Sequence, residues 1–197
     1  FHMPLQSGND HMLRLMRRRY NSELYMRRVE KIRELIPDAC IGVDVITGHP
    51  GETDVHFDES FQFIKELDVS YLHVFTYSER PDTHALSIKP VISHNVRKKR
   101  TKKLRRLSDK KRFEFDTRFL NEFKPVLFES ANYDNFIQGW TDNYIRVKTP
   151  YRPDLENSIC DVKIGKRFRD GTHKAEFQSE TRGRNHSLEK VIAELTV

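Results

Sequence analysis

The sequence predicts an α/β fold in its first half and a small antiparallel β-barrel in its second half. Strand-like and helix-like segments alternate with short loops up to about residue 90, which is typical of parallel βαβ units. A long helical pattern with a dense run of Lys and Arg follows. Beyond residue 124, short apolar runs are separated by Asn, Asp, Gly and Pro, a rhythm that favours a small all-β barrel.

The first domain is expected to span residues 1–90. "HMPL" indicates the end of a strand, and "QSGND" indicates a turn before a helix from about Asp10 to Arg19. Asn21 or Ser22 caps a second helix, which Pro37 stops. "CIGVDVIT" is typical of a buried parallel strand, "DESFQFIKEL" has helical periodicity, and "YLHVFTY" predicts the next strand.

Three successive strand ends carry polar or Gly-rich loops: "PLQSGND", "VITGHPGET" and "HVFTYSERPDT". Because ligands bind at the carboxyl ends of parallel strands, the three loops together predict one shared site, although each alone also fits an ordinary βα connection. The groups offered there are Gln6, Ser7, Gly8, Gly48, Gly51, Glu52, Tyr77 and Arg80, with Glu52 expected to cap the following helix.

The segment 91–123 is expected to form a basic linker helix. Residues 97–112 contain eleven Lys or Arg and one acid. Such concentrated charge favours a polyanionic partner, with a solvated helix face as the alternative. The candidate RNA-binding residues of this helix are Arg97, Lys98, Lys99, Arg100, Lys102, Lys103, Arg105 and Arg106.

The segment 124–178 is expected to form a five-stranded barrel like an OB-fold. Arg146 and Lys148 occupy alternate positions of one strand and therefore share a face, and Tyr144 is a candidate for stacking on a base. About half of the aromatic rings, Trp140 included, are expected in the barrel core. The tail 179–197 carries a short helix pattern after Ser187 and no recognisable function.

Composition narrows the class of protein. The chain has 197 residues, of which 37% are hydrophobic and 32% charged, enough for a core within a well-solvated surface. No apolar run reaches the roughly 18 residues of a membrane helix, and no secretory signal is visible, so no membrane partner is expected. Two distant cysteines fit a reducing compartment, so we expect a cytoplasmic protein. The first residues read as the end of a strand, so we also expect a piece of a longer protein.

Three motifs in order carry a resemblance to a known family: "HMPLQSGND…MRRRY", "IGVDVITGHPGET" and "HVFTYSERPDT". Over residues 1 to about 177 the chain resembles the C-terminal half of the radical S-adenosylmethionine barrel of the methylthiotransferases, followed by the RNA-binding TRAM barrel of that family. These enzymes replace a C–H bond with C–S–CH3. "GWTDNYIRV" is similar to the branch that acts on tRNA bearing N6-threonylcarbamoyladenosine.

The resemblance implies an enzyme that methylthiolates N6-threonylcarbamoyladenosine next to the tRNA anticodon, with the anticodon stem-loop as partner. Two alternatives stay open: a non-catalytic RNA-binding module, and a methylthiotransferase that acts on a ribosomal protein. The basic helix and "GWTDNYIRV" favour RNA over a protein target.

The resemblance also implies S-adenosylmethionine across the strand ends. Gln6, Ser7, Gly8, Gly48, Pro50, Gly51 and Glu52 would flank it. Arg18 of the Met-x-Arg-x-Tyr stretch would pair with the cofactor carboxylate, and Asp44 would point into the barrel. Alternatively, Arg18 pairs within its helix and Asp44 braces a loop. Tyr77 and Arg80 would face the substrate.

The chain departs from the family in its cysteines. The family holds 4Fe-4S clusters with cysteines, one set in a Cys-x-x-x-Cys-x-x-Cys loop, whereas Cys40 and Cys160 stand 120 residues apart. We therefore expect no catalytic residue, no bound cluster and no activity in this chain alone. Histidine spacing predicts no metal site, and His49 is interpreted as a loop variation. An unpaired sheet edge predicts a homodimer.

Overall fold

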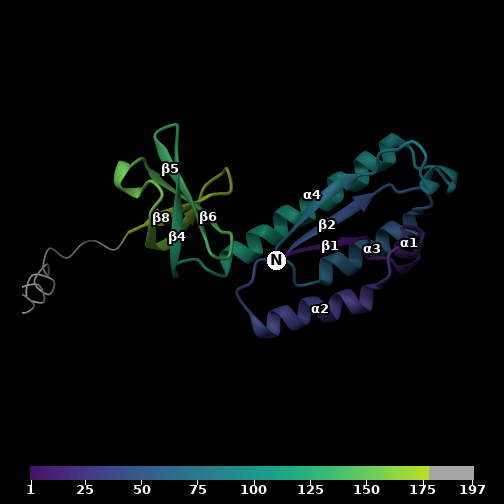
Figure 1. Ribbon diagram of the computed structural model, residues 1–197, viewed down its shortest axis with the longest axis horizontal. Coiled ribbons are helices and arrows are strands. Elements are labelled where there is room, and N and C mark those ends of the chain that lie inside the picture. Colours follow the sequence, from purple (N-terminus) through teal and green to yellow (C-terminus); the bar gives the residue numbers. More distant parts are fainter. Residues whose placement is uncertain (178–197) are drawn as a thin grey trace, which may run out of the picture. The chain divides into compact units, whose positions relative to one another are not determined.

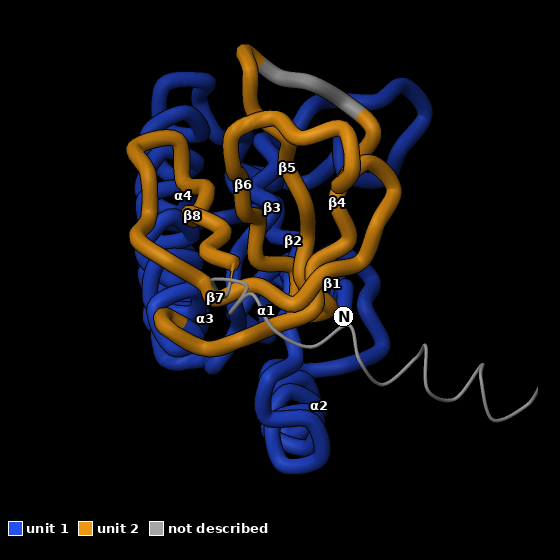
Figure 2. Tube along the Cα trace, turned by 90° about the vertical axis from the view of Figure 1, so that its left-hand side faces the viewer, with its two compact units in different colours: residues 1–119 blue, residues 120–197 orange. Residues whose placement is uncertain are grey.

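The computed structural model describes residues 1–177, apart from the side chains of residues 131–133, and the chain divides into two compact units (Figure 2). Unit 1 comprises Phe1–Phe119, and unit 2 begins at Leu120. The helix predicted after Ser187 lies outside the described residues. Within the part of the chain that is described, no helix combines the length and the apolar composition needed to cross a membrane.

Unit 1 contains a parallel three-stranded sheet in the order β1 (His2–Gln6), β2 (Gly42–Thr47) and β3 (Tyr71–Thr76), drawn in Figure 1. The helices α1 (Asp10–Leu15) and α2 (Ser22–Leu35) connect β1 to β2, and α3 (Asp54–Glu66) connects β2 to β3. The 3-10 helix η1 (His84–Ser87) and the long helix α4 (His94–Thr117) follow β3. The predicted α/β alternation is confirmed.

Local sequence signals set the helix ends. The Asn21 side chain accepts the N–H of Leu24 at the start of α2, as expected of an N-cap. At the start of α3 the cap is Thr53, whose hydroxyl accepts the N–H of His56. The expectation that Glu52 caps this helix is therefore wrong. The first helix ends at Leu15 rather than Arg19, because the next residues turn.

One face of the sheet forms the core of unit 1. Strand residues Val43, Val45, Leu72 and Val74 pack there with Tyr25 and Val29 of α2, Phe57 and Ile64 of α3, and Leu104 and Leu107 of α4. Helix α4 is thus part of unit 1 and packs on the sheet through its apolar positions. Alternate strand residues point to the opposite face, where Phe75 is 53% exposed.

Unit 2 is a closed five-stranded barrel. Its strands are β4 (Phe123–Tyr133), β5 (Phe136–Thr141), β6 (Arg146–Pro150), β7 (Ile159–Arg167) and β8 (His173–Glu176), with a 3-10 turn η2 (Pro153–Leu155) before β7. The barrel order is β4-β5-β6-β8-β7, with β6 and β8 parallel and every other pair antiparallel. This connectivity is that of an OB-fold. The predicted antiparallel barrel is confirmed except for the parallel β6–β8 pair, which joins strands distant in sequence.

The barrel interior is filled by aliphatic side chains and one Phe. The fully buried members are Val126, Phe128, Ile137, Ile145, Val147, Val162 and Ile164. Trp140 is not among them, because its neighbours Gly139 and Thr141 take the inward positions of β5. The expectation that Trp140 fills the core is therefore wrong.

Candidate cofactor and nucleic-acid sites

The loops that follow the three strands of unit 1 meet at one end of the sheet. The rings of His49 and Tyr77 lie edge to face, 5.2 Å apart between centroids, which joins the loops after β2 and β3. A Cβ atom built on Gly51 would lie 2.9 Å from Cδ1 of Leu15 in α1, so the β2 loop also lies against the helix that follows β1. The tips of the strands thus share one region of unit 1.

Most residues expected to flank a cofactor there are buried within unit 1: Gln6, Ser7, Gly8, Gly48, Pro50, Gly51 and Glu52. The Ser7 hydroxyl accepts the N–H of Asn9 at 3.2 Å and lies 3.4 Å from Oγ of Ser60. The N–H of Gly8 donates to the same Ser60 oxygen at 2.8 Å. These groups hold the first loop against α3, so their hydrogen bonds are already used.

Gly48 shows why one of these glycines is needed. It has φ +75°, and a Cβ there would lie 2.3 Å from Cγ of Arg97. Arg97 is buried, donates to the carbonyls of Ile92 (2.8 Å) and Tyr77 (3.1 Å), and pairs with Glu79. The close approach at Gly48 is therefore made by an arginine of α4, and a cofactor is not required to explain it.

Glu52 and Arg100 form a buried ion pair. Nη1 of Arg100 lies 2.6 Å from Oε2 of Glu52, and the side chains are 6% and 3% exposed. The same carboxylate oxygen accepts the N–H of Gly48 at 2.8 Å. Burial raises the pKa of Glu52 above its ordinary value, while the Gly48 N–H and Arg100 act against that rise. This pair braces the β2 loop against α4.

The remaining predicted residues of unit 1 are accessible. Arg18 is exposed, and its side chain has no ion pair within residues 1–177. Asp44 is half-buried on the face of the sheet opposite the core, called the open face below, where its Oδ2 lies 2.8 Å from Nε2 of His2. Tyr77 and Arg80 both line a cavity of about 370 Å³. The rest of its lining consists of Ile46, Phe75, Thr76, Ser78, Thr83 and Ala85.

The basic helix α4 divides into two sets of charges. Arg97 and Arg100 are buried and paired inside unit 1, so they are not accessible to a phosphate. The other predicted cations, Lys98, Lys99, Lys102, Lys103, Arg105 and Arg106, are exposed. Lys103 pairs with Asp58 at 2.9 Å. A hollow of about 550 Å³ runs beside Lys98, Lys102, Arg105 and Arg106.

A strip of aromatic and basic side chains lies on the outer surface of β5 and β6. The Arg146 guanidinium lies 5.3 Å from the ring centroid of Trp140, its cross-strand neighbour. Lys148 lies over the ring of Phe136 at 5.2 Å and pairs with Asp170 at 2.5 Å. This hydrogen bond from Lys148 holds the pKa of Asp170 below its usual range. Tyr144 is 62% exposed, with its ring 5.9 Å from that of Trp140.

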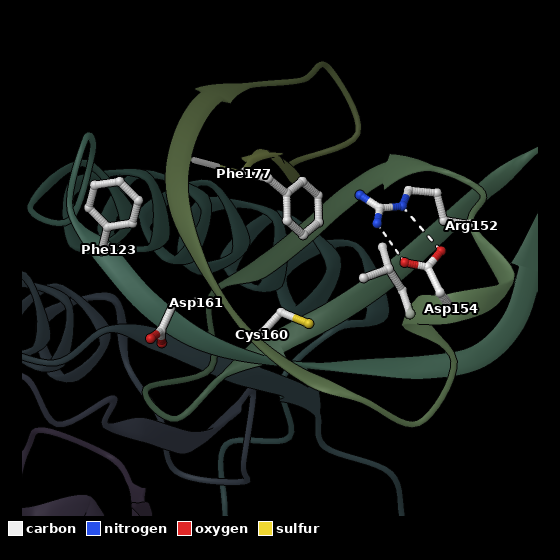
Figure 3. A pocket seen from close by; sticks show the side chains of 7 residues that line it. Phe123, Arg152, Asp154, Cys160, Asp161 and Phe177 are labelled. Carbon is white, nitrogen blue, oxygen red and sulfur yellow. Dashed lines mark hydrogen bonds and ion pairs between the residues drawn. The ribbon is translucent and has the colours of Figure 1, made fainter. Parts of the chain in front are cut away.

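A cavity in unit 2 was not anticipated from the sequence. It measures about 650 Å³ and is lined by Phe123, Arg152, Asp154, Leu155, Cys160, Asp161 and Phe177. Figure 3 shows the Arg152–Asp154 pair on one side of it and Phe123 on the other. No sequence motif signals this cavity, because its lining comes from β4, β7, the η2 turn and the residue after β8.

Comparisons with known proteins agree with this architecture. Residues 1–64 match the Radical SAM superfamily. The chain is 37% identical over 167 residues to "Threonylcarbamoyladenosine tRNA methylthiotransferase MtaB" of Bacillus subtilis, covering 83% of this chain and 37% of that protein. The chain belongs to the radical SAM methylthiotransferase family. Two further relatives carry the name "tRNA-2-methylthio-N(6)-dimethylallyladenosine synthase". That of Sulfurimonas denitrificans is 34% identical over 83% of this chain and 38% of its own length. That of Thermobifida fusca is 43% identical over 64% of this chain and 26% of its own length.

This member of the radical SAM methylthiotransferase family spans 26–38% of the length of those three relatives. Its cysteines do not fit an iron–sulfur cluster, which requires several thiolates at one point. Cys40 is buried in unit 1, and Cys160 is half-buried in unit 2. Burial also raises the pKa of the Cys40 thiol, so its thiolate form is disfavoured.

Proposed function

We propose that the chain is the C-terminal part of an enzyme that methylthiolates an adenosine next to the anticodon of tRNA. Its substrate would be N6-threonylcarbamoyladenosine, and its product the 2-methylthio derivative. The observation that carries the proposal is the similarity to a relative of that name along 83% of the chain. Relatives named for dimethylallyladenosine are similarly close, which makes N6-dimethylallyladenosine the second candidate substrate.

Unit 1 would contribute part of the S-adenosylmethionine site. The cavity lined by Tyr77 and Arg80 supports this, since it lies at the strand tips and combines aromatic with polar groups. The Tyr77 hydroxyl is buried without a hydrogen-bond partner among the described residues, and a ligand group could supply one. Arg18 would bind a carboxylate, as an exposed guanidinium is suited to do. When bound, S-adenosylmethionine would supply the radical and methyl chemistry of the family, and the two cysteines, one in each unit, do not provide the thiolate set that a cluster requires.

Unit 2 would be the TRAM domain, and the exposed cations of α4 in unit 1 would offer a second set of RNA contacts. Support comes from the OB-type order of strands, whose β5–β6 region is where such barrels bind nucleic acid. Trp140 and Tyr144 offer faces for base stacking, and Arg146 a neighbouring cation. The exposed cations of α4 would contact phosphates.

Binding of anticodon stem-loop RNA tests this proposal. Fluorescence anisotropy of labelled RNA would be measured over a range of salt concentrations for the wild type and for Lys98→Ala/Lys102→Ala/Arg105→Ala. The matched control, Arg27→Ala/Arg28→Ala/Lys31→Ala, removes three exposed charges from α2 of the same unit. We expect the α4 variant to lose affinity and to lower the salt slope by roughly one per phosphate contact, with the control unchanged. Equal losses in both variants would contradict a specific role for α4.

The modified base separates the candidate substrates. Stem-loops carrying threonylcarbamoyl, dimethylallyl or no modification would be compared under one salt condition. Tighter binding of the threonylcarbamoyl form supports the first candidate, and tighter binding of the dimethylallyl form supports the second. Equal, weak binding to all three, and to an unrelated RNA, would leave only a non-catalytic RNA-binding module.

A further inference from the structure

Three metal-binding side chains lie together on the open face of the unit 1 sheet: His2 of β1, Asp44 of β2 and His73 of β3. The function proposed above assigns no metal ion to these three residues. We propose that these three residues form a binding site for a divalent transition-metal ion, of the Zn²⁺ or Fe²⁺ type. The proposal does not depend on the tRNA substrate.

The register of the sheet creates this cluster. Asp44 pairs with His73 on one side and with Pro4 on the other. His2 stands two residues before Pro4, so all three side chains point to the same face of adjacent parallel strands. Residues 2, 44 and 73 are far apart in sequence, which is why histidine spacing alone predicts no metal site.

The ligand atoms are close to metal-binding geometry. One atom from each residue lies within 4.8 Å of the other two, and Nε2 of His2 is 2.8 Å from Oδ2 of Asp44. Ligands at roughly 2.0–2.2 Å from one tetrahedral zinc ion lie about 3.3–3.6 Å apart. Rotations of the three side chains would therefore accompany binding of the ion.

The carboxylate has one oxygen still to satisfy. The Asp44 side chain is 19% exposed, and its Oδ1 is buried with no hydrogen-bond partner in residues 1–177. A buried carboxylate oxygen without a donor is costly, and a bound cation offsets that cost. This observation is independent of the clustering of the two histidines.

A neighbouring aromatic residue fixes one ligand. The Tyr71 ring meets the His73 ring edge-on, with centroids 5.0 Å apart. Gly42 makes room for it, since a Cβ at that position would lie 2.5 Å from Cζ of Tyr71. The rings of His2 and His73 also stack, 5.4 Å apart. These ring contacts restrict the rotation of the His73 imidazole.

The type of ion follows from the ligands. Two imidazoles and one carboxylate suit Zn²⁺, Co²⁺ and Fe²⁺, and three protein ligands leave further positions for water or another oxygen or nitrogen ligand. Calcium and magnesium prefer oxygen ligands throughout. Since no cysteine takes part, the bound ion should show no thiolate coordination.

Titration of the chelator-treated chain with Zn²⁺ by calorimetry, and with Co²⁺ by absorption, tests the proposal. We expect one equivalent to bind with N/O ligation, and Asp44→Asn and His73→Ala each to weaken binding by about 10-fold or more, as ligand-shell changes do. The control His11→Ala alters a different stacked histidine pair, His11 and His56, and should leave the affinity unchanged. Because His2 is exposed at the start of β1, His2→Ala serves if the other variants fail to fold. No binding by the wild type, unchanged affinity in the ligand variants, or a loss in His11→Ala would each overturn the proposal.

Discussion

Replacing Arg100 with Met should destabilise unit 1 by about 3–5 kcal/mol, the usual cost of removing one partner from a buried ion pair. The pair is 6% and 3% exposed, so water cannot solvate the Glu52 carboxylate that is left behind. Arg100 also pairs with Asp54, whose side chain is 92% exposed. The matched control Asp54→Asn breaks that exposed contact and should cost under about 1 kcal/mol.

Urea unfolding can follow the two units separately. The single Trp of the chain, Trp140, lies in unit 2, whereas all described α-helices lie in unit 1. Helical ellipticity therefore reports unit 1, and tryptophan fluorescence reports unit 2. Arg100→Met should shift the ellipticity transition and leave the fluorescence transition in place. The double variant Glu52→Gln/Arg100→Met should recover part of the loss, because no buried charge remains.

The loss of stability in the Arg100→Met variant should also depend on pH. Without Arg100, the pKa of Glu52 rises further above its ordinary value, because one influence that lowers it is gone. A carboxyl whose folded-state pKa exceeds its unfolded value loses stability as pH rises through the folded pKa. The deficit should therefore be smaller at about pH 5 than at about pH 8. A loss as small as that of Asp54→Asn, or a deficit that shrinks as pH rises, would refute this account of the pair.

Four further outcomes are expected. Gly48→Ala should lower the free energy of unfolding of unit 1 by about 2 kcal/mol or more, because of left-handed backbone strain and a collision with Arg97. The control Gly171→Ala shares the positive φ but meets only the flexible end of the Arg167 side chain. An equal loss in that control would contradict the role of the collision. Phe128→Ala should lower the free energy of unfolding of unit 2 by about 3–5 kcal/mol, as followed by tryptophan fluorescence. A matching shift of the ellipticity transition would show that the two units do not unfold separately. Ellman's reagent should modify Cys160 rapidly and Cys40 only on unfolding, and a fast phase that survives in Cys160→Ser would contradict this. Light scattering should detect a dimer formed through the unpaired sheet edge, and a monodisperse monomer would count against it.

Much of the fold was readable in the sequence because its signals are local. Caps such as Asn21, β-branched strand runs and alternating polar residues depend on neighbours a few positions away, so they predicted the parallel units and the five strands of the barrel. The shared face of Arg146 and Lys148 follows from the same two-residue period.

The candidate sites were less predictable. The sequence around a basic or polar residue does not show whether its partner is solvent, a ligand or another part of the protein. Arg97 and Arg100 looked like the rest of the basic run, yet both are buried and pair with Glu79 and Glu52, which lie on loops after other strands. Trp140 looked like a core residue, yet the barrel places it outside beside Arg146. Nothing in the spacing of His2, Asp44 and His73 shows that they meet.

The sequence by itself determined the order and type of the elements and the membership of the radical SAM methylthiotransferase family, since periodicity, caps and motifs are written along the chain. Only the tertiary structure decided which charges are buried and which are exposed, and which distant side chains share one face. The physical reason is that burial and pairing depend on contacts across strands and helices far apart in sequence, and strand register fixes those contacts.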